Sequence, residues 1–158
     1  MIEYFFEDFK DFLRLLKKND VEYLIVGGYA VSIHSRPRST QDIDIWIKSS
    51  KGNAEKVLKV INEFGFGEME ISLNDLINEN MVIQLGNPPI RIDIMTAIDG
   101  VEFNEAYKNK SSFSYYDLEN VYYISFDDLL KNKESSGRDK DIDDIKWLKK
   151  YGKDNKKI

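Results

Sequence analysis

Two segments decide this fold: Leu24-Ile25-Val26-Gly27-Gly28-Tyr29-Ala30 and Arg38-Ser39-Thr40-Gln41-Asp42-Ile43-Asp44-Ile45-Trp46. In the first, an apolar run of strand length stops at a glycine pair, and a short helical pattern follows from Tyr29 to His34. In the second, apolar and polar residues alternate, which predicts a strand over Gln41–Lys48. The isoleucines occupy one face of that strand, and Asp42, Asp44 and Trp46 share the other.

Further helices and strands are predicted on both sides of these segments. Apolar residues at helical spacing predict helices over residues 3–18, 51–64, 73–77, 102–107, 125–136 and 139–151. Strands are predicted over residues 22–26, 81–85, 90–95, 112–116 and 121–124. In the last helix we expect Ile142, Ile145 and Leu148 to face inward. Ser125 is the expected N-cap of the preceding helix, and Gly137 the residue that ends it.

The composition favours one globular domain over residues 1–158, with a helical C-terminal element at about 125–151. The chain is 42% hydrophobic and 32% charged, and it has no cysteine, which excludes disulfides and cysteine nucleophiles. No window approaches the roughly 18 consecutive apolar residues of a membrane span. Because the N-terminal residues lack the pattern of a signal peptide, we expect a cytoplasmic enzyme or binding module that does not contact a membrane.

The charge is unevenly distributed along the chain. The net charge is −5, but residues 131–158 hold ten Lys/Arg and six Asp/Glu, about +4, which leaves about −9 for residues 1–130. A basic end beside an acidic body suits a site that brings metal cations and a polyphosphate together. The alternative is a solvated lysine-rich tail, and for Lys153–Lys157 that interpretation is the better one.

Three carboxylates have the pattern of a metal site. Residues i and i+2 of a strand point the same way, so Asp42 and Asp44 should lie side by side and repel unless a cation intervenes. Asp93 occupies the same kind of position on the strand over residues 90–95. Such an oxygen cage suits Mg²⁺ or Mn²⁺. The alternative for Asp-Ile-Asp alone is an ordinary solvated strand face.

The glycine pair has the composition of a phosphate-binding turn. Gly27 and Gly28 stand at a strand-to-helix junction, where backbone can approach a ligand closely and the helix N-terminus attracts phosphate. Taken alone, the pair is weak evidence, because most glycine pairs are simple turns. The order strand, Gly-Gly, short helix, Asp-x-Asp and then a lone strand aspartate is the informative feature.

These residues resemble the signature of the DNA polymerase β-like nucleotidyltransferase superfamily. The matching positions read Gly27-Gly28-x-Ala30-x-x-x-His34-x-x-x-Arg38-x-Thr40-x-Asp42-x-Asp44. A second match, Leu129-x-x-x-Lys133-x-x-x-Gly137-Arg138-x-Lys140-Asp141-x-x-Asp144, is similar to the closing helices of its minimal bacterial members. Those members include toxin-type nucleotidyltransferases of abortive-infection and toxin–antitoxin systems.

The resemblance implies an α/β (α+β) fold in which helices flank a mixed β-sheet. It implies that Asp42 and Asp44 bind metal, and that Asp93 completes the site and helps to deprotonate the acceptor hydroxyl. The implied nucleotide-binding residues are Gly27, Gly28, Arg38, Thr40, Lys133, Arg138 and Lys140. Two positions depart from the pattern: Gly28 stands where relatives often have a serine that contacts phosphate, and Ser35 where they often have glycine.

Several single residues also have structural interpretations. His34, the only histidine, is better explained as a capping or packing residue than as a catalyst, and Trp46 as a cover of the sheet. Arg38 could instead form an ion pair with Asp42 or Asp141. Thr40 could support the entry to its strand, and Lys133 and Arg138 could serve solubility alone.

The leading functional prediction is a Mg²⁺- or Mn²⁺-dependent nucleotidyltransferase. It would move a nucleoside monophosphate from an NTP such as ATP to a hydroxyl of a tRNA, a protein or a small molecule. The rival is a non-catalytic module that binds a nucleotide or a partner and has kept the fold. A third interpretation is a toxin silenced by an antitoxin partner. Acceptor recognition would come from loops, from residues 101–124, from a homodimer or from a partner protein.

Overall fold

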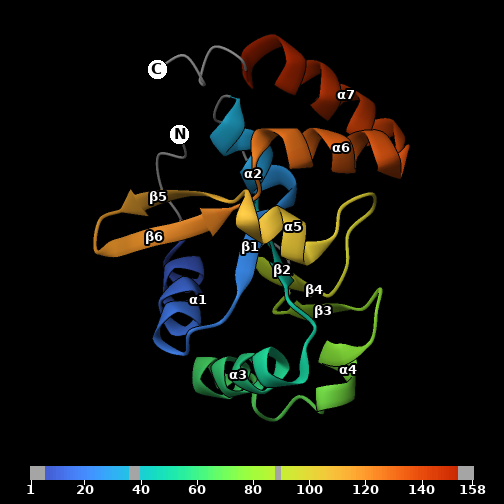
Figure 1. Cartoon of the computed structure of the whole chain (residues 1–158). Coiled ribbons are helices and arrows are strands. Elements are labelled where there is room, and N and C mark those ends of the chain that lie inside the picture. Colours follow the sequence, from blue (N-terminus) through green and yellow to red (C-terminus); the bar gives the residue numbers. More distant parts are fainter. Residues whose placement is uncertain (1–5, 36–39, 88–89, 153–158) are drawn as a thin grey trace.

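A six-stranded mixed sheet organises the part of the chain that the computed structural model describes, residues 6–35, 40–87 and 90–152 (Figure 1). The spatial order is β3-β4-β2-β1-β6-β5. The pairs β1/β2, β3/β4 and β5/β6 are antiparallel, whereas β1/β6 and β2/β4 are parallel. The strands are β1 (Tyr23–Val26), β2 (Asp42–Ile47), β3 (Val82–Leu85), β4 (Arg91–Met95), β5 (Ser111–Tyr115) and β6 (Leu118–Tyr123).

Helices cover both faces of the sheet, which confirms the predicted mixed sheet flanked by helices. They are α1 (Glu7–Lys18), α2 (Gly27–His34), α3 (Lys51–Ile61), α4 (Leu73–Ile77), α5 (Phe103–Lys108), α6 (Phe126–Ser136) and α7 (Asp139–Trp147). Short π-helical segments, Asn62–Phe66 and Leu148–Gly152, continue α3 and α7. None of the described helices is long and apolar enough to cross a bilayer.

The alternation of residues in β2 separates two cores. Ile43, Ile45 and Ile47 pack with Phe9 and Phe12 of α1 and with apolar residues of α3. Figure 1 places α1 and α3 below the sheet and α2, α6 and α7 above it. The opposite face holds a second core, which includes Leu24, Val26, Val31, Trp46 and Leu129. The carboxylates of β2 and β4 belong to this second face.

A buried asparagine fixes the apolar core beneath the sheet. The Asn53 side chain of α3 accepts a hydrogen bond from the Glu22 N–H at 2.8 Å and donates to the carbonyls of Glu22 and Lys48 at 3.0 and 2.8 Å. These groups precede β1 and follow β2, so one side chain ties both strand ends to α3. The Ser50 side chain caps the same helix by accepting from the Asn53 N–H.

Two caps predicted from sequence are confirmed around α6. The Ser125 side chain accepts a hydrogen bond from the Asp128 N–H, and Gly137 ends the helix with a left-handed φ of 67°. The prediction for α7 was wrong at one residue, since Ile142 is 47% exposed. The inward positions of α7 belong to Asp141 and Asp144, because both carboxylates form ion pairs with Lys133 of α6.

Other boundaries moved by a few residues. α2 begins at Gly27 instead of Tyr29, and α3 ends at Ile61 before its π-helical continuation. β6 begins at Leu118, three residues before the predicted start, because it pairs with β5 in a hairpin. Trp46 is 1% exposed and packs edge-on against Phe103, so it covers the sheet as predicted.

Candidate active site

The parallel pairing of β2 with β4 brings the three predicted carboxylates onto one face. Asp44 lies opposite Asp93 in the register, and Asp42 lies opposite Arg91. On the other side of β2, Asp44 lies opposite Val26, the last residue of β1. The glycine pair that follows Val26 therefore reaches the same place as the carboxylates. All of these residues line one cleft of about 770 Å³.

Arg91 links two of the carboxylates. Its Nε and Nη2 donate to the two oxygens of Asp93 at 2.7 and 2.9 Å, and Nη2 also donates to Asp42 Oδ2 at 3.2 Å. Bidentate pairs of this kind fix orientation as well as charge. Arg91 was not among the predicted site residues. The available signal was its position two residues before Asp93 on the same strand face.

Asp44 is the carboxylate that these ion pairs leave out. Among the described residues it has no hydrogen-bond or ion-pair partner, although it lies between Gly27 and Asp93. Burial, followed by the charges of Asp93 and Asp42, raises the pKa of Asp44 to about 6, and the charges of Lys133 and Lys140 oppose this. A partly buried, unpaired carboxylate beside two others favours a bound cation.

The residues fit a hard divalent cation once one contact is released. No group of three or more His, Asp or Glu side chains in the described ranges is arranged as a ready metal site. The donors are nonetheless all carboxylate oxygens, which Mg²⁺ and Mn²⁺ prefer. A cation between Asp42 and Asp44 needs only the single 3.2 Å contact of Arg91 with Asp42 to open. The bidentate pair of Arg91 with Asp93 can stay.

The Gly27-Gly28 turn approaches Asp44 more closely than any other residue type would allow. Gly27 has a φ of 67°, and a Cβ at this position would lie 2.0 Å from Asp44 Oδ2. No side chain caps α2, whose N-cap residue is Val26. The uncapped N–H groups at this helix start lie beside the cleft, which suits an anion. Glycine at position 27 is therefore required by the close contact with Asp44 as well as by the backbone conformation.

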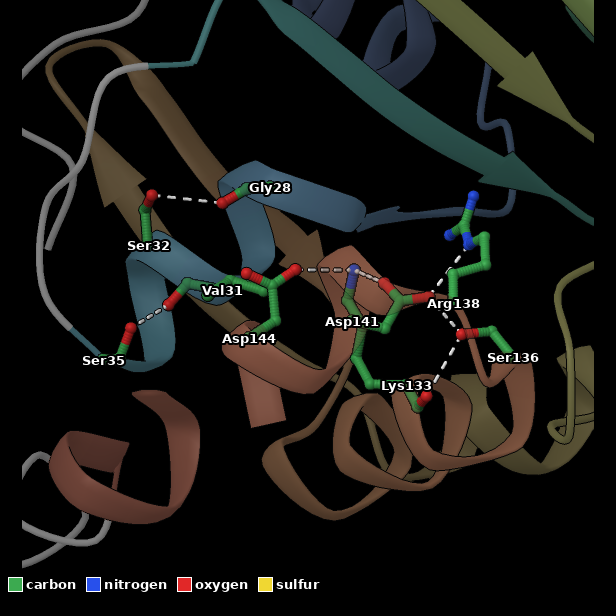
Figure 2. A network of polar contacts seen from close by, with 9 residues as sticks. All are labelled: Gly28, Val31, Ser32, Ser35, Lys133, Ser136, Arg138, Asp141 and Asp144. Carbon is green, nitrogen blue, oxygen red and sulfur yellow. Dashed lines mark hydrogen bonds and ion pairs between the residues drawn. The ribbon is translucent and has the colours of Figure 1, made fainter. Parts of the chain in front are cut away.

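A buried ion-pair network on α6 and α7 forms another wall of the cleft (Figure 2). Lys133 is only 5% exposed, and its Nζ lies 3.0 Å from Asp141 Oδ1 and 3.1 Å from Asp144 Oδ2. Ser136 and Arg138 also donate to Asp141. Burial raises the pKa of Asp141, but hydrogen bonds from Ser136, Arg138 and Lys133 outweigh it and hold the pKa at about 2.

The cleft gathers most of the predicted nucleotide-binding residues. Gly27, Gly28, Thr40, Lys133, Arg138 and Lys140 all line it. Thr40 donates its hydroxyl to the Asp42 carbonyl at 3.3 Å, which supports the entry to β2. The interpretation of Lys133 as a solubility residue is wrong because the side chain is buried. Arg38 lies outside the described residues.

His34 lies away from the carboxylates and packs at the end of α2. Its Nε2 lies 2.6 Å from the Ile124 carbonyl, to which a protonated Nε2 donates. The ring also contacts Tyr123 and Phe126. This geometry agrees with the packing interpretation of the only histidine.

The mixed sheet, with carboxylates on two adjacent strands beside a glycine turn, defines a nucleotidyltransferase fold. The chain belongs to the family described as nucleotidyltransferase of unknown function (DUF6036), whose model matches residues 3–150. A search of curated proteins by sequence gave no match.

Three solved structures share this fold with the chain. A candidate nucleotidyltransferase, TM1012 from Thermotoga maritima, shares 17% identity over 90% of this chain and 91% of its own, with a TM-score of 0.59. The lincosamide adenylyltransferase LnuA, with lincomycin bound, has 18% identity, coverage of 90% and 95%, and a TM-score of 0.57. ANT(2″)-Ia in complex with adenylyl-2″-tobramycin has 13% identity over 89% of this chain and 84% of its own, with a TM-score of 0.52. At these identities the likeness shows the fold.

Gly27→Ala tests whether the turn must touch Asp44. Gly137 is the matched control, because it has the same φ of 67° but nothing within 4 Å of an added Cβ. Gly137→Ala should cost only the left-handed strain, about 1–2 kcal/mol in the free energy of unfolding. Gly27→Ala should cost more, because the methyl group also displaces the Asp44 carboxylate. Equal losses in urea denaturation of the two variants would contradict the close contact.

Asp44→Asn tests the burial of an unpaired charge. The pKa of Asp44 is raised from 3.8 in the unfolded chain to about 6 in the fold. Ionisation of Asp44 therefore destabilises the fold as the pH rises above 4, and the full effect is reached above pH 6. At pH 7 the variant should be more stable than the wild type by on the order of 1–3 kcal/mol. The difference should shrink as the pH falls from 6 to 4. Glu55→Gln, which removes an exposed carboxylate on α3, is the control. A difference independent of pH would exclude this explanation.

Proposed function

We propose that this protein is a divalent-metal-dependent nucleotidyltransferase that transfers a nucleoside monophosphate from an NTP to a hydroxyl. One observation carries the proposal: Asp42, Asp44 and Asp93 share a cleft with the Gly27-Gly28 turn on one side and the cations of α6 and α7 on another. Family membership supports a transferase. The carboxylate oxygens, the uncapped helix start and the cations match the parts that a metal–triphosphate complex requires.

Each group has a defined task in this account. Asp42 and Asp44 would hold Mg²⁺ or Mn²⁺, which neutralises phosphate charge and activates the attacking oxygen. The N–H groups at the start of α2 would bind phosphate oxygens, and Arg138 and Lys140 at the cleft rim would bind the polyphosphate. Lys133 would assist them with its remaining N–H, since two of its three donors are directed at Asp141 and Asp144.

The transfer step forms one bond and breaks one. The acceptor oxygen attacks the α-phosphorus, the α–β phosphoanhydride bond breaks, and pyrophosphate leaves with the bonding electrons. The hydroxyl proton passes to Asp93. Both oxygens of Asp93 accept from Arg91, but each keeps a second lone pair for this proton. Arg91 thus orients the proposed base.

ATP is a reasonable donor, since two proteins of this fold are named as an adenylyltransferase and as a complex with an adenylylated product. Their names mention lincomycin and tobramycin, so hydroxyl compounds of this kind are candidate acceptors beside tRNA and protein. Transfer to RNA or protein would also be consistent with a toxin that a partner antitoxin silences. The rival is a non-catalytic binding module, and one contact favours it: Arg91 forms ion pairs with both Asp42 and Asp93 and so occupies two of the three carboxylates.

Asp42→Ala and Asp44→Ala test the proposal. The wild type, incubated with Mg²⁺, each α-labelled NTP and a cell lysate, should incorporate label, whereas both variants should fall to background because the metal is lost. Glu55→Ala, at an exposed position of α3, should label like the wild type. Circular dichroism checks that the variants fold. Incorporation by either variant at the wild-type level would contradict the mechanism, and tight NTP binding without any transfer would favour the rival.

A further inference from the structure

An apolar patch lies in the same cleft as the carboxylates. It consists of Val82, Met95, Ala97 and Ile98, which we call the apolar lip. Val82 is 55% exposed, although it is a large aliphatic residue within a β-strand. In the register it lies opposite Met95 of β4. The sequence alternation of β3 places Val82 and Gln84 outward, while Ile83 and Leu85 face the core.

Val82 of the apolar lip and the Gly27-Gly28 turn lie on opposite sides of the carboxylates in the strand order. Across the sheet, β1 leads to the glycine turn, β2 holds Asp44, β4 holds Asp93, and β3 holds Val82. Met95 follows Asp93 by two residues and therefore points the same way. A triphosphate at the turn would thus leave the apolar lip open next to the proposed base, Asp93.

The charges of the cleft differ between its two sides. Among the described residues that line it, the cations are Arg91, Lys133, Arg138 and Lys140. Three of these belong to the α6–α7 end of the cleft, which lies above the sheet in Figure 1. Arg91 is held by Asp42 and Asp93. Asp99, which follows the lip residue Ile98, is exposed, and its carbonyl accepts a hydrogen bond from Asn132 of α6 at 2.9 Å, so Val82 is the lip residue that lies away from these cations.

A polynucleotide would fit this side of the cleft poorly. Proteins that bind nucleic acid neutralise several phosphates with Lys and Arg side chains, and single-stranded substrates also stack on aromatic side chains. Around Val82 and Met95 the described lining of the cleft offers neither a cation nor an aromatic ring. Aliphatic side chains with a few polar groups are typical instead of a small-molecule site.

We infer that the apolar lip is the acceptor subsite, and that the acceptor is an uncharged or cationic small molecule that carries a hydroxyl and an apolar part. This inference rests on the proposed transferase activity. The apolar part would lie on Val82 and Met95, which would place the hydroxyl at Asp93. The acceptor oxygen then bonds to the α-phosphorus, pyrophosphate leaves with the electrons of the broken bond, and the proton goes to Asp93.

Val82→Lys tests the subsite because it adds a cation to the lip and removes apolar surface. Lysate is separated into ultrafiltrate, RNA and protein, and each fraction is incubated with Mg²⁺, labelled NTP and enzyme. We expect label in the ultrafiltrate, and a drop of about tenfold or more with Val82→Lys. The KM for the NTP should not change. Met69→Lys, at an exposed apolar residue outside the cleft, controls for the added charge and should label like the wild type.

The outcomes separate this inference from the proposed function. Label in RNA or protein instead of the ultrafiltrate would overturn the inference and leave the transferase standing. Label in the ultrafiltrate that Val82→Lys and Met69→Lys lower equally would also overturn it. An absence of label from every fraction, with the wild type folded, would remove the proposed function and this inference together.

Discussion

The structure depends on the parallel pairing of β2 with β4, which sets Asp44 directly beside Asp93. Carboxylates on neighbouring strands repel each other, and neighbouring residues neutralise some of these charges but not all of them. Arg91 neutralises Asp93 and Asp42 from within the same sheet. Asp44 has no such partner among the described residues, and its pKa rises to about 6 because of burial and its acidic neighbours. The fold therefore maintains an electrostatic cost at Asp44, which a bound divalent cation would relieve.

The C-terminal helices complete the site through a second buried charge cluster. Lys133 on α6 is held by Asp141 and Asp144 on α7, so the two helices are locked at a fixed relative position. Breaking a buried ion pair from one side is strongly destabilising, which makes this contact a constraint on helix packing. This contact also sets the position of the residues at the start of α7 relative to the cleft. Arg138 and Lys140, which lie at the start of the locked helix, are presented to the cleft that holds Asp44.

Much of this arrangement follows from local sequence patterns, and the remainder depends on tertiary contacts. The alternation in β2 and β4 is sufficient to predict that Asp42, Asp44 and Asp93 share the face opposite the isoleucines. The role of Arg91 is not predictable in this way, because an arginine on a polar strand face is ordinary until its partners are placed. Ile142 is exposed because two ion pairs determine which side of α7 faces inward. The position of Val82 beside the carboxylates depends on the pairing of β3 with β4.

We propose that Asp42 and Asp44 hold a divalent cation beside Asp93, the proposed base. The most direct measurement is electron paramagnetic resonance of Mn²⁺, titrated into the protein in the presence of a non-hydrolysable NTP. The free Mn²⁺ signal should fall as the wild type binds the ion, and a saturable site should be found. Asp44→Asn should abolish that binding without unfolding the protein, whereas Glu55→Gln should not change it. Equal Mn²⁺ binding by the wild type and Asp44→Asn would contradict the account.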